Sequence, residues 1–227
     1  RQLRTHLPRL GSRSAHCERS AFMMKTIAKY AAVFGRQPSA VREPLSDGHV
    51  TSCTFPPTRC GLWRRLMSEA HDRTVSVTAG LSAYRMPVPS DQNQTSRIPD
   101  RIELIAFSSV PIVGGQSGSE DVLSAVLQMI GDYIINQKLA VGVGHTLDFG
   151  EPLASNVAMT AILFSLPQGV DSKRIERCSE AMQLLNIVPI TAKELEYCRQ
   201  SGVIALLDRF DEVQIPPVFD CFRGSAV

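Results

Sequence analysis

The stretch LLNIVPITAKELEYCRQSGVIALLDRFDE, residues 184–212, carries the strongest structural signal in the chain. Its first seven residues are almost entirely apolar, which is typical of a strand covered on both faces. Thr191 and Glu194 then follow at the spacing of a capping box, so we expect a helix to begin after Thr191. Gly202 ends that helix, and a second short helix follows. The stretch therefore predicts one buried strand that leads into two helices.

Apolar side chains recur at helical spacing in both helices, so each helix is expected to have one side that faces the protein core. We predict that the inward residues are Leu195 and Cys198 in the first helix and Ile204, Leu207 and Phe210 in the second.

Four further strands are expected upstream, in residues 50–55, 74–79, 101–107 and 159–166. In the second of these, Val75, Val77 and Ala79 alternate with hydroxyl-bearing residues, which predicts a strand with one buried face. In the third, Ile102, Leu104 and Ala106 alternate with Glu103 and Ile105. The last is an almost unbroken apolar run, as in a strand covered on both faces.

Two helices are expected upstream of residue 140. Residues 23–34 place apolar side chains at three- and four-residue spacing, and residues 117–137 carry a continuous apolar stripe. The stripe consists of Leu123, Val126, Leu127, Ile130 and Ile134. Because strands and helices are interspersed without regular βαβ alternation, we predict an α+β fold, in which helices flank a mixed, mostly antiparallel β-sheet.

The charge of the chain is unevenly distributed. Residues 1–22 hold five arginines against one glutamate, a net charge of +4, so the other 205 residues carry −2 of the total of +2. We therefore expect a basic, disordered extension over residues 1–22 and a single domain over residues 23–227, with the working protein starting at Met23 or Met24. Without the extension, a broad cationic face for nucleic acid loses its support. The longest apolar stretch, residues 158–166, is far shorter than the roughly 20 residues that span a bilayer, so no membrane partner is expected.

Six cysteines are present, at positions 17, 53, 60, 178, 198 and 221. A chain of this length has little need of disulfides, so we expect reduced thiols and a cytoplasmic location. Neither C-x-x-C nor H-x-x-x-H occurs, so the sequence favours neither a metal site nor a cofactor.

The motif VGVGHTLDFG, residues 141–150, suggests chemistry at first sight. Its two glycines do not form the G-x-G-x-x-G pattern that opens a phosphate-binding helix. His145 has no G-x-S-x-G nucleophile in the chain to activate. It could pair with Asp148 as a general base, although spacing alone does not establish hydrogen-bond reach. The favoured interpretation is a bulged strand at a binding rim.

Several acidic residues are open to more than one interpretation. Glu103 is either a buried acid with a raised pKa or, as we favour, a residue on the solvent face of its strand. Asp208, Asp211 and Glu212 form an acidic helix end, which is either a solvated face or a steering patch for a basic partner.

Taken together, these segments resemble the suppressor of fused family in its bacterial single-domain form, over roughly residues 45 to 225. The resemblance rests on motifs in a fixed order, and the block 184–212 is the most specific of them. The other motifs are Gly80-Leu81-Ser82, the RIELI strand at 101–105, a long helix ahead of Gly144-His145-Thr146, and the closing Asp220 and Arg223. Two features depart from the family pattern: no tryptophan stands near the start of the long helix, and residues 168–183 replace a shorter polar link.

The resemblance implies an adaptor protein. Animal members clamp a peptide of a transcription factor between two lobes, and similar bacterial domains are regarded as immunity proteins that neutralise a toxin. This chain has the length of one lobe. We therefore expect a non-enzymatic, protein-binding adaptor or immunity protein that acts by occlusion. Its expected partner-binding residues are His145, Thr146, Asp148, Asp208, Asp211 and Glu212. The alternative is a small hydrolase or ligand-binding enzyme that uses His145 with Asp148 or Glu103.

Overall fold

A computed structural model of the chain describes residues 12–34, 37–44, 48–55, 74–87, 98–108, 119–153, 157–168 and 182–227. Within these residues, seven strands form one sheet in the order β1-β2-β3-β4-β7-β6-β5. The strands are β1 (Ala40–Arg42), β2 (Thr51–Phe55), β3 (Thr74–Ala79), β4 (Ile102–Ser108), β5 (Thr146–Asp148), β6 (Met159–Ser165) and β7 (Gln183–Thr191). Neighbouring strands are antiparallel except for β4 and β7, which are parallel. The predicted α+β fold with a mixed, mostly antiparallel sheet is confirmed.

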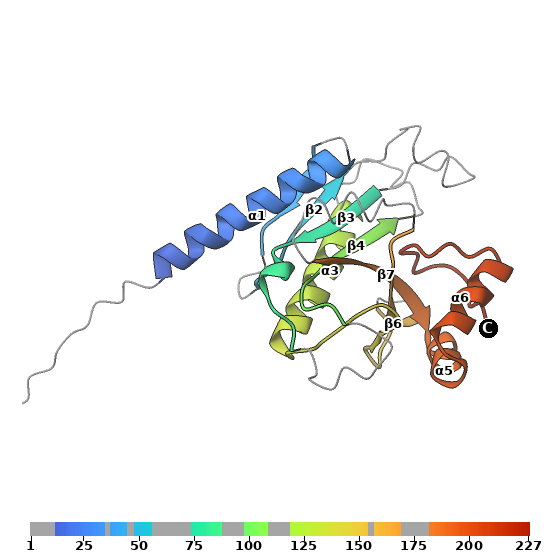
Figure 1. Cartoon of the computed structure of the whole chain (residues 1–227). Helices are drawn as coiled ribbons and strands as arrows, with labels where there is room; N and C mark the ends of the chain where they lie inside the picture. The colour runs from blue at the N-terminus through green and yellow to red at the C-terminus, as the bar shows by residue number, and fades with distance from the viewer. Residues whose placement is uncertain are drawn as a thin grey trace, which may run out of the picture.

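Helices cover both faces of the sheet (Figure 1). They are α1 (Ser12–Phe34), α3 (Ser119–Asn136), α5 (Ala192–Ser201) and α6 (Val203–Glu212), and a short 3₁₀ turn, η1 (Leu81–Ala83), follows β3. Helix α3 packs on one face of β2, β3 and β4. Helix α1 lies on the opposite face of the same strands, and α5 and α6 pack at the other end of the sheet, on β6 and β7.

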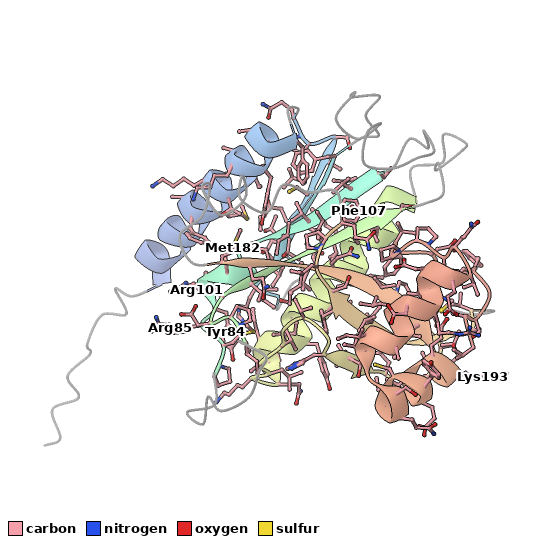
Figure 2. All side chains as sticks on the ribbon, turned by 45° about the vertical axis from the view of Figure 1, so that its right-hand side comes forward. Tyr84, Arg85, Arg101, Phe107, Met182 and Lys193 are labelled. Atoms are coloured by element: carbon pink, nitrogen blue, oxygen red, sulfur yellow. The ribbon has the colours of Figure 1, made fainter. Side chains whose placement is uncertain are left out.

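The core is divided by the alternation of side chains along each strand. On β4, Leu104 and Ala106 face the cluster beneath α3, whereas Ile105 and Phe107 face the cluster beneath α1. Met182, at the start of β7, also belongs to the cluster beneath α1 and lies beside that helix in Figure 2. A third cluster joins β6 and β7 to Leu195, Leu206 and Phe210 of α5 and α6.

The hydroxyl-bearing face of β3 differs from its prediction. Thr74, Ser76 and Thr78 are all buried, because α3 covers that face as well. Their burial is compensated by hydrogen bonds: Thr54 Oγ1 lies 2.9 Å from Ser76 Oγ and 2.8 Å from Ser124 Oγ of α3. A buried polar seam therefore joins α3 to β2 and β3.

The prediction for α6 was wrong at one residue. Ile204 is 73% exposed, and the helix buries Leu206 in its place, together with the predicted Phe210. Leu206 and Phe210 fit the helical period as well as Ile204, Leu207 and Phe210 do. The position of β6 and β7 determines that the first set faces the core. Leu207 is half-buried, as is Cys198 on α5.

Residues 141–150 form a turn followed by a short edge strand. Gly144 has φ +86°, and His145 N–H donates to the Gly142 carbonyl across the turn at 3.2 Å. A Cβ at Gly144 would lie 3.1 Å from Val203 Cγ1, so the turn packs closely on the start of α6. The predicted bulge does not lie here; the irregular pairing lies on β6, between Met159 and Ala161.

The expected boundary at residue 22 does not mark a break in structure. Helix α1 begins at Ser12 and runs across it without interruption. Residues 1–11 lie outside the described residues.

Candidate functional site

A rim formed by β5 and α6 contains the residues that the sequence singled out for partner binding. Thr146 and Asp148 pair with Leu163 and Ala161, so both lie on the sheet face that α5 and α6 cover. Asp148 accepts a hydrogen bond from Arg199 Nη2 of α5 at 3.0 Å and one from Gly150 N–H at 2.9 Å. These contacts fix the edge strand against the helices.

The outward side of α6 continues this rim. Ile204, Asp208, Asp211 and Glu212 are exposed, and their spacing of four, seven and eight residues places them along one side of the helix. Val143, 38% exposed, lies in the turn whose Gly144 contacts Val203, the neighbour of Ile204. We call these residues together the β5–α6 surface: Val143, His145, Thr146, Asp148, Ile204, Asp208, Asp211 and Glu212.

The charges of this surface are mostly acidic. Glu212 pairs with Arg209, and Asp148 pairs with Arg199. The side chains of Asp208 and Asp211 make no hydrogen bond or ion pair with any other described residue, and both residues are exposed. The surface thus presents two apolar side chains together with exposed negative charge.

The residues of the alternative enzyme hypothesis are not brought together. Glu103 lies on β4, and strands β7 and β6 separate it from β5, which carries Asp148. Among the described residues no hydrogen bond joins His145 to Asp148, whose carboxylate is held by Arg199 instead. Nor do the described residues contain a group of three or more His, Cys, Asp or Glu side chains that could hold a metal ion.

Glu103 is a buried acid, contrary to the interpretation we favoured. Its side chain is fully buried, and burial raises its pKa, although hydrogen bonds from Ser82, Thr78 and Gly80 act in the opposite direction. The carboxylate accepts from Ser82 Oγ at 2.7 Å, from the N–H groups of Ser82 and Gly80 at 3.0 Å, and from Thr78 Oγ1 at 2.5 Å. Arg101 donates to the Ser82 carbonyl of the same turn at 2.6 Å. Figure 2 shows Arg101 near the end of the sheet where this turn lies. The Gly80-Leu81-Ser82 motif folds around the carboxylate of Glu103, which belongs to the RIELI motif. These contacts explain why the two motifs occur together.

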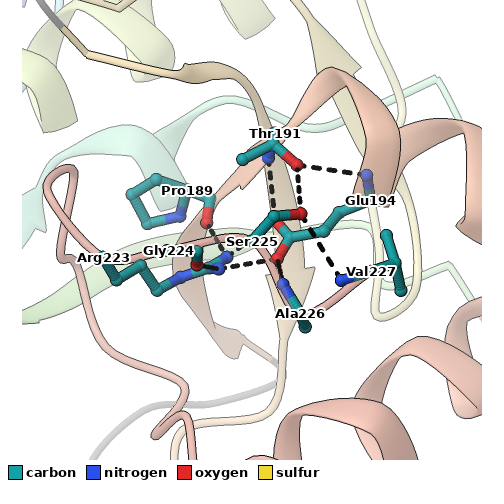
Figure 3. Close-up of polar contacts among 8 residues, drawn as sticks. All are labelled: Pro189, Thr191, Glu194, Arg223, Gly224, Ser225, Ala226 and Val227. Carbon is teal, nitrogen blue, oxygen red and sulfur yellow. Dashed lines mark hydrogen bonds and ion pairs between the residues drawn. The ribbon is translucent and has the colours of Figure 1, made fainter.

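Glu194 and Arg223 form a second buried polar centre (Figure 3). Thr191 and Glu194 make the predicted capping box, in which Thr191 N–H donates to Glu194 Oε2 at 2.8 Å. Arg223 donates to both oxygens of Glu194, at 2.6 and 2.9 Å, and to the Pro189 carbonyl at 2.7 Å. Its guanidinium also lies 4.8 Å from the centre of the Phe210 ring.

These contacts determine the protonation state of Glu194 and the path of the C-terminal segment. Burial acts to raise the pKa of Glu194, but the hydrogen bonds from Arg223, Thr191 N–H and Ala226 N–H outweigh it and lower the pKa. The ionised carboxylate therefore holds the C-terminal segment against the start of α5.

The sequence did not single out Val143 or Ile204 for the candidate surface. The predicted inward side of α6 includes Ile204. Only a helix with Leu206 and Phe210 inward would leave Ile204 exposed to solvent. Val143 stands between two glycines, and that pattern indicates an irregular backbone without showing which side chain is exposed.

None of the described helices is both long enough and apolar enough to cross a membrane. Three cysteines whose side chains are described, Cys53, Cys198 and Cys221, are unpaired.

Comparison with known proteins places these features in a family. A family model of the suppressor of fused protein (SUFU) matches residues 65–224. A search of curated proteins finds no match.

Several solved structures share the fold. A suppressor of fused homologue from Neisseria gonorrhoeae superposes with a TM-score of 0.63 at 15% identity, covering 92% of this chain and 98% of that one. The Sufu–Fu complex gives a TM-score of 0.63 at 12% identity, with coverage of 90% and 92%. Drosophila suppressor of fused gives 0.60 at 12% identity, with coverage of 90% and 51%. The family model, which spans most of the chain, confirms the resemblance seen in the sequence, and the chain belongs to the suppressor of fused family.

Proposed function

We propose that this chain is a non-enzymatic protein-binding domain and that a protein partner docks on the β5–α6 surface. The observation that carries the proposal is Ile204, which is 73% exposed on a helix whose opposite side is packed into the core. A large apolar side chain held on a fixed helix can serve as an anchor, because little conformational freedom is lost when a partner covers it. Val143 is a second exposed apolar side chain of this surface, and its acids Asp148, Asp208, Asp211 and Glu212 are exposed as well.

The charge of the surface supports a basic partner. Exposed carboxylates at Asp208 and Asp211 attract a cationic protein and speed its association. We propose that the partner is a toxin domain, such as a cationic nuclease, and that the chain acts as an immunity or adaptor protein by occluding it. The Sufu–Fu complex, a relative of similar fold solved with another protein, supports a protein as the partner. The unpaired thiols agree with a cytoplasmic setting.

Co-expression tests the immunity role. The product of the open reading frame beside this one is expressed alone and together with the chain. We expect growth arrest in the first case and growth in the second. A toxin that arrests growth equally in both cases would contradict the immunity role.

Point variants test the surface separately. We expect Ile204→Lys to weaken binding of the identified partner by about 30-fold or more, as for a buried anchor residue. Met129→Lys is the matched control, since Met129 is 45% exposed on α3 and lies on the opposite face of the sheet. Titration calorimetry measures both affinities. Equal affinities for the two variants would remove the β5–α6 surface as the docking site.

A further inference from the structure

The contact between α1 and the sheet is almost wholly apolar. Ile27, Tyr30 and Phe34 are the buried apolar side chains of its described part, and Phe34 packs against Phe55 of β2 with the ring centroids 4.8 Å apart. The one hydrogen bond described for an α1 side chain stays within the helix, from Thr26 Oγ1 to the Phe22 carbonyl. Among the described residues, no side-chain hydrogen bond or ion pair ties α1 to the sheet.

Burial of α1 also leaves polar atoms without partners. The Tyr30 hydroxyl is buried and has no hydrogen-bond partner among the described residues, and the same is true of Thr51 Oγ1 on β2. Thr51 is two and four residues before Cys53 and Phe55 on β2, so its side chain lies on the same face of the sheet, which α1 covers. Burial raises the pKa of Tyr30, and the ionisable groups of Glu103 and Cys53 act in the same direction. An unsatisfied buried hydroxyl favours any state in which water can reach it.

The opposite face of the same strands is held by polar bonds. Gln128 Nε2 of α3 donates to the carbonyls of Arg42 and Glu43 at 2.9 Å each. Asp132 Oδ1 accepts from His49 N–H at 2.7 Å. Together with the Ser124–Thr54–Ser76 seam, these bonds connect β1, β2 and β3 to α3 independently of α1.

We propose that α1 is a cover that opens separately: it leaves the sheet while the sheet and α3 stay folded, and it uncovers Cys53. The Cys53 side chain is fully buried in the closed state, in the cluster beneath α1. Figure 1 shows α1 extending beyond the sheet at one end, so only part of the helix has to detach.

Alkylation of Cys53 by iodoacetamide, followed by mass spectrometry of its peptide from the full-length protein, tests this proposal. In the closed state burial raises the Cys53 pKa to about 12, and the thiol is inaccessible. Alkylation therefore reports the open state. We expect the rate to rise with urea with a slope clearly smaller than that of global unfolding, because only the surface between α1 and the sheet becomes exposed. Half-buried Cys198 in the same sample monitors the reagent.

Two matched pairs of variants identify the moving element. We expect Tyr30→Phe to slow alkylation by about 5- to 30-fold, because it removes the unsatisfied hydroxyl from the closed state. Tyr133→Phe changes an exposed tyrosine of α3 and should leave the rate unchanged. We expect Ile27→Ala to raise the rate by about tenfold or more, and Met24→Ala, at an exposed position on the same helix, to leave it unchanged.

The proposal fails if Cys53 reacts only through global unfolding. In that case the rate would rise with urea from the lowest concentrations, with the full slope found for unfolding by circular dichroism. An unchanged rate in Tyr30→Phe would also overturn the proposal.

Discussion

The Glu194–Arg223 pair shows how a single buried residue can hold a segment that has no regular secondary structure. The Glu194 side chain is fully buried and that of Arg223 is 7% exposed. Removing the arginine would leave an uncompensated buried carboxylate, so we predict that Arg223→Ala lowers the free energy of unfolding by about 3–5 kcal/mol. Urea denaturation measures the change.

The control for this prediction is an exposed ion pair. Arg85 is 73% exposed and pairs with Asp100 at 3.1 Å, so Arg85→Ala should cost less than about 1 kcal/mol. Similar costs for the two variants would show that the buried pair contributes no more than a surface pair.

Glu103 and Glu194 predict opposite pH dependences. Burial raises the folded-state pKa of Glu103, so its contribution to stability is fully present below the unfolded pKa of about 4.3 and is lost as pH rises through the folded pKa. For Glu194, hydrogen bonds outweigh burial and lower the pKa, so its contribution is present above the unfolded pKa and is lost as pH falls through the folded value.

Glutamine variants separate these two contributions. As pH falls, wild type should gain stability relative to Glu103→Gln and lose stability relative to Glu194→Gln. Urea denaturation at several pH values measures both differences. A shift of the same sign in both variants would contradict the assignment.

At the scale of a secondary-structure element, α6 offers two residues of nearly equal size, two positions apart, in opposite environments. Leu206 is fully buried, whereas Ile204 is 73% exposed. We predict that Leu206→Ala lowers the free energy of unfolding by about 2–5 kcal/mol through the cavity it leaves, whereas Ile204→Ala changes it by no more than about 0.5 kcal/mol. Thermal or urea denaturation checks both. The reverse order would mean that the helix is rotated.

The same helix shows where prediction from the sequence reaches its limit. The capping box of Thr191 and Glu194 is local, so its spacing was enough to predict it. The inward side of α6 depends on β6 and β7, and two sets of residues fitted the helical period equally well. Glu103 could not be placed either, because its carboxylate is held by Thr78 and the turn at residues 80–82, which lie more than 20 residues away in the sequence. The candidate surface shares this limit, since it joins a turn at residue 143 to a helix 60 residues later.

At the scale of the whole molecule, one parallel strand pair joins two antiparallel groups. Strands β1 to β4 form one group and β7, β6 and β5 the other, and β4 and β7 connect them with Leu104 opposite Leu185. Both leucines are fully buried in the cluster beneath α3, which also includes Ile162 and Phe164 of β6. Because this cluster spans both groups, we expect the sheet to unfold as one unit.

Native-state hydrogen exchange tests this expectation. Amides of β3, β4, β7 and β6 should exchange with the same free energy as global unfolding, whereas those of the three-residue edge strands β1 and β5 should exchange faster. Leu104→Ala should lower protection equally in β3 and β6, by about 2–5 kcal/mol, although only β3 adjoins β4 directly. Val41→Ala, at an exposed position of the edge strand β1, should leave both unchanged. If Leu104→Ala lowered protection in β3 and left β6 unchanged, the two groups would unfold separately, and the shared cluster would not make the sheet cooperative.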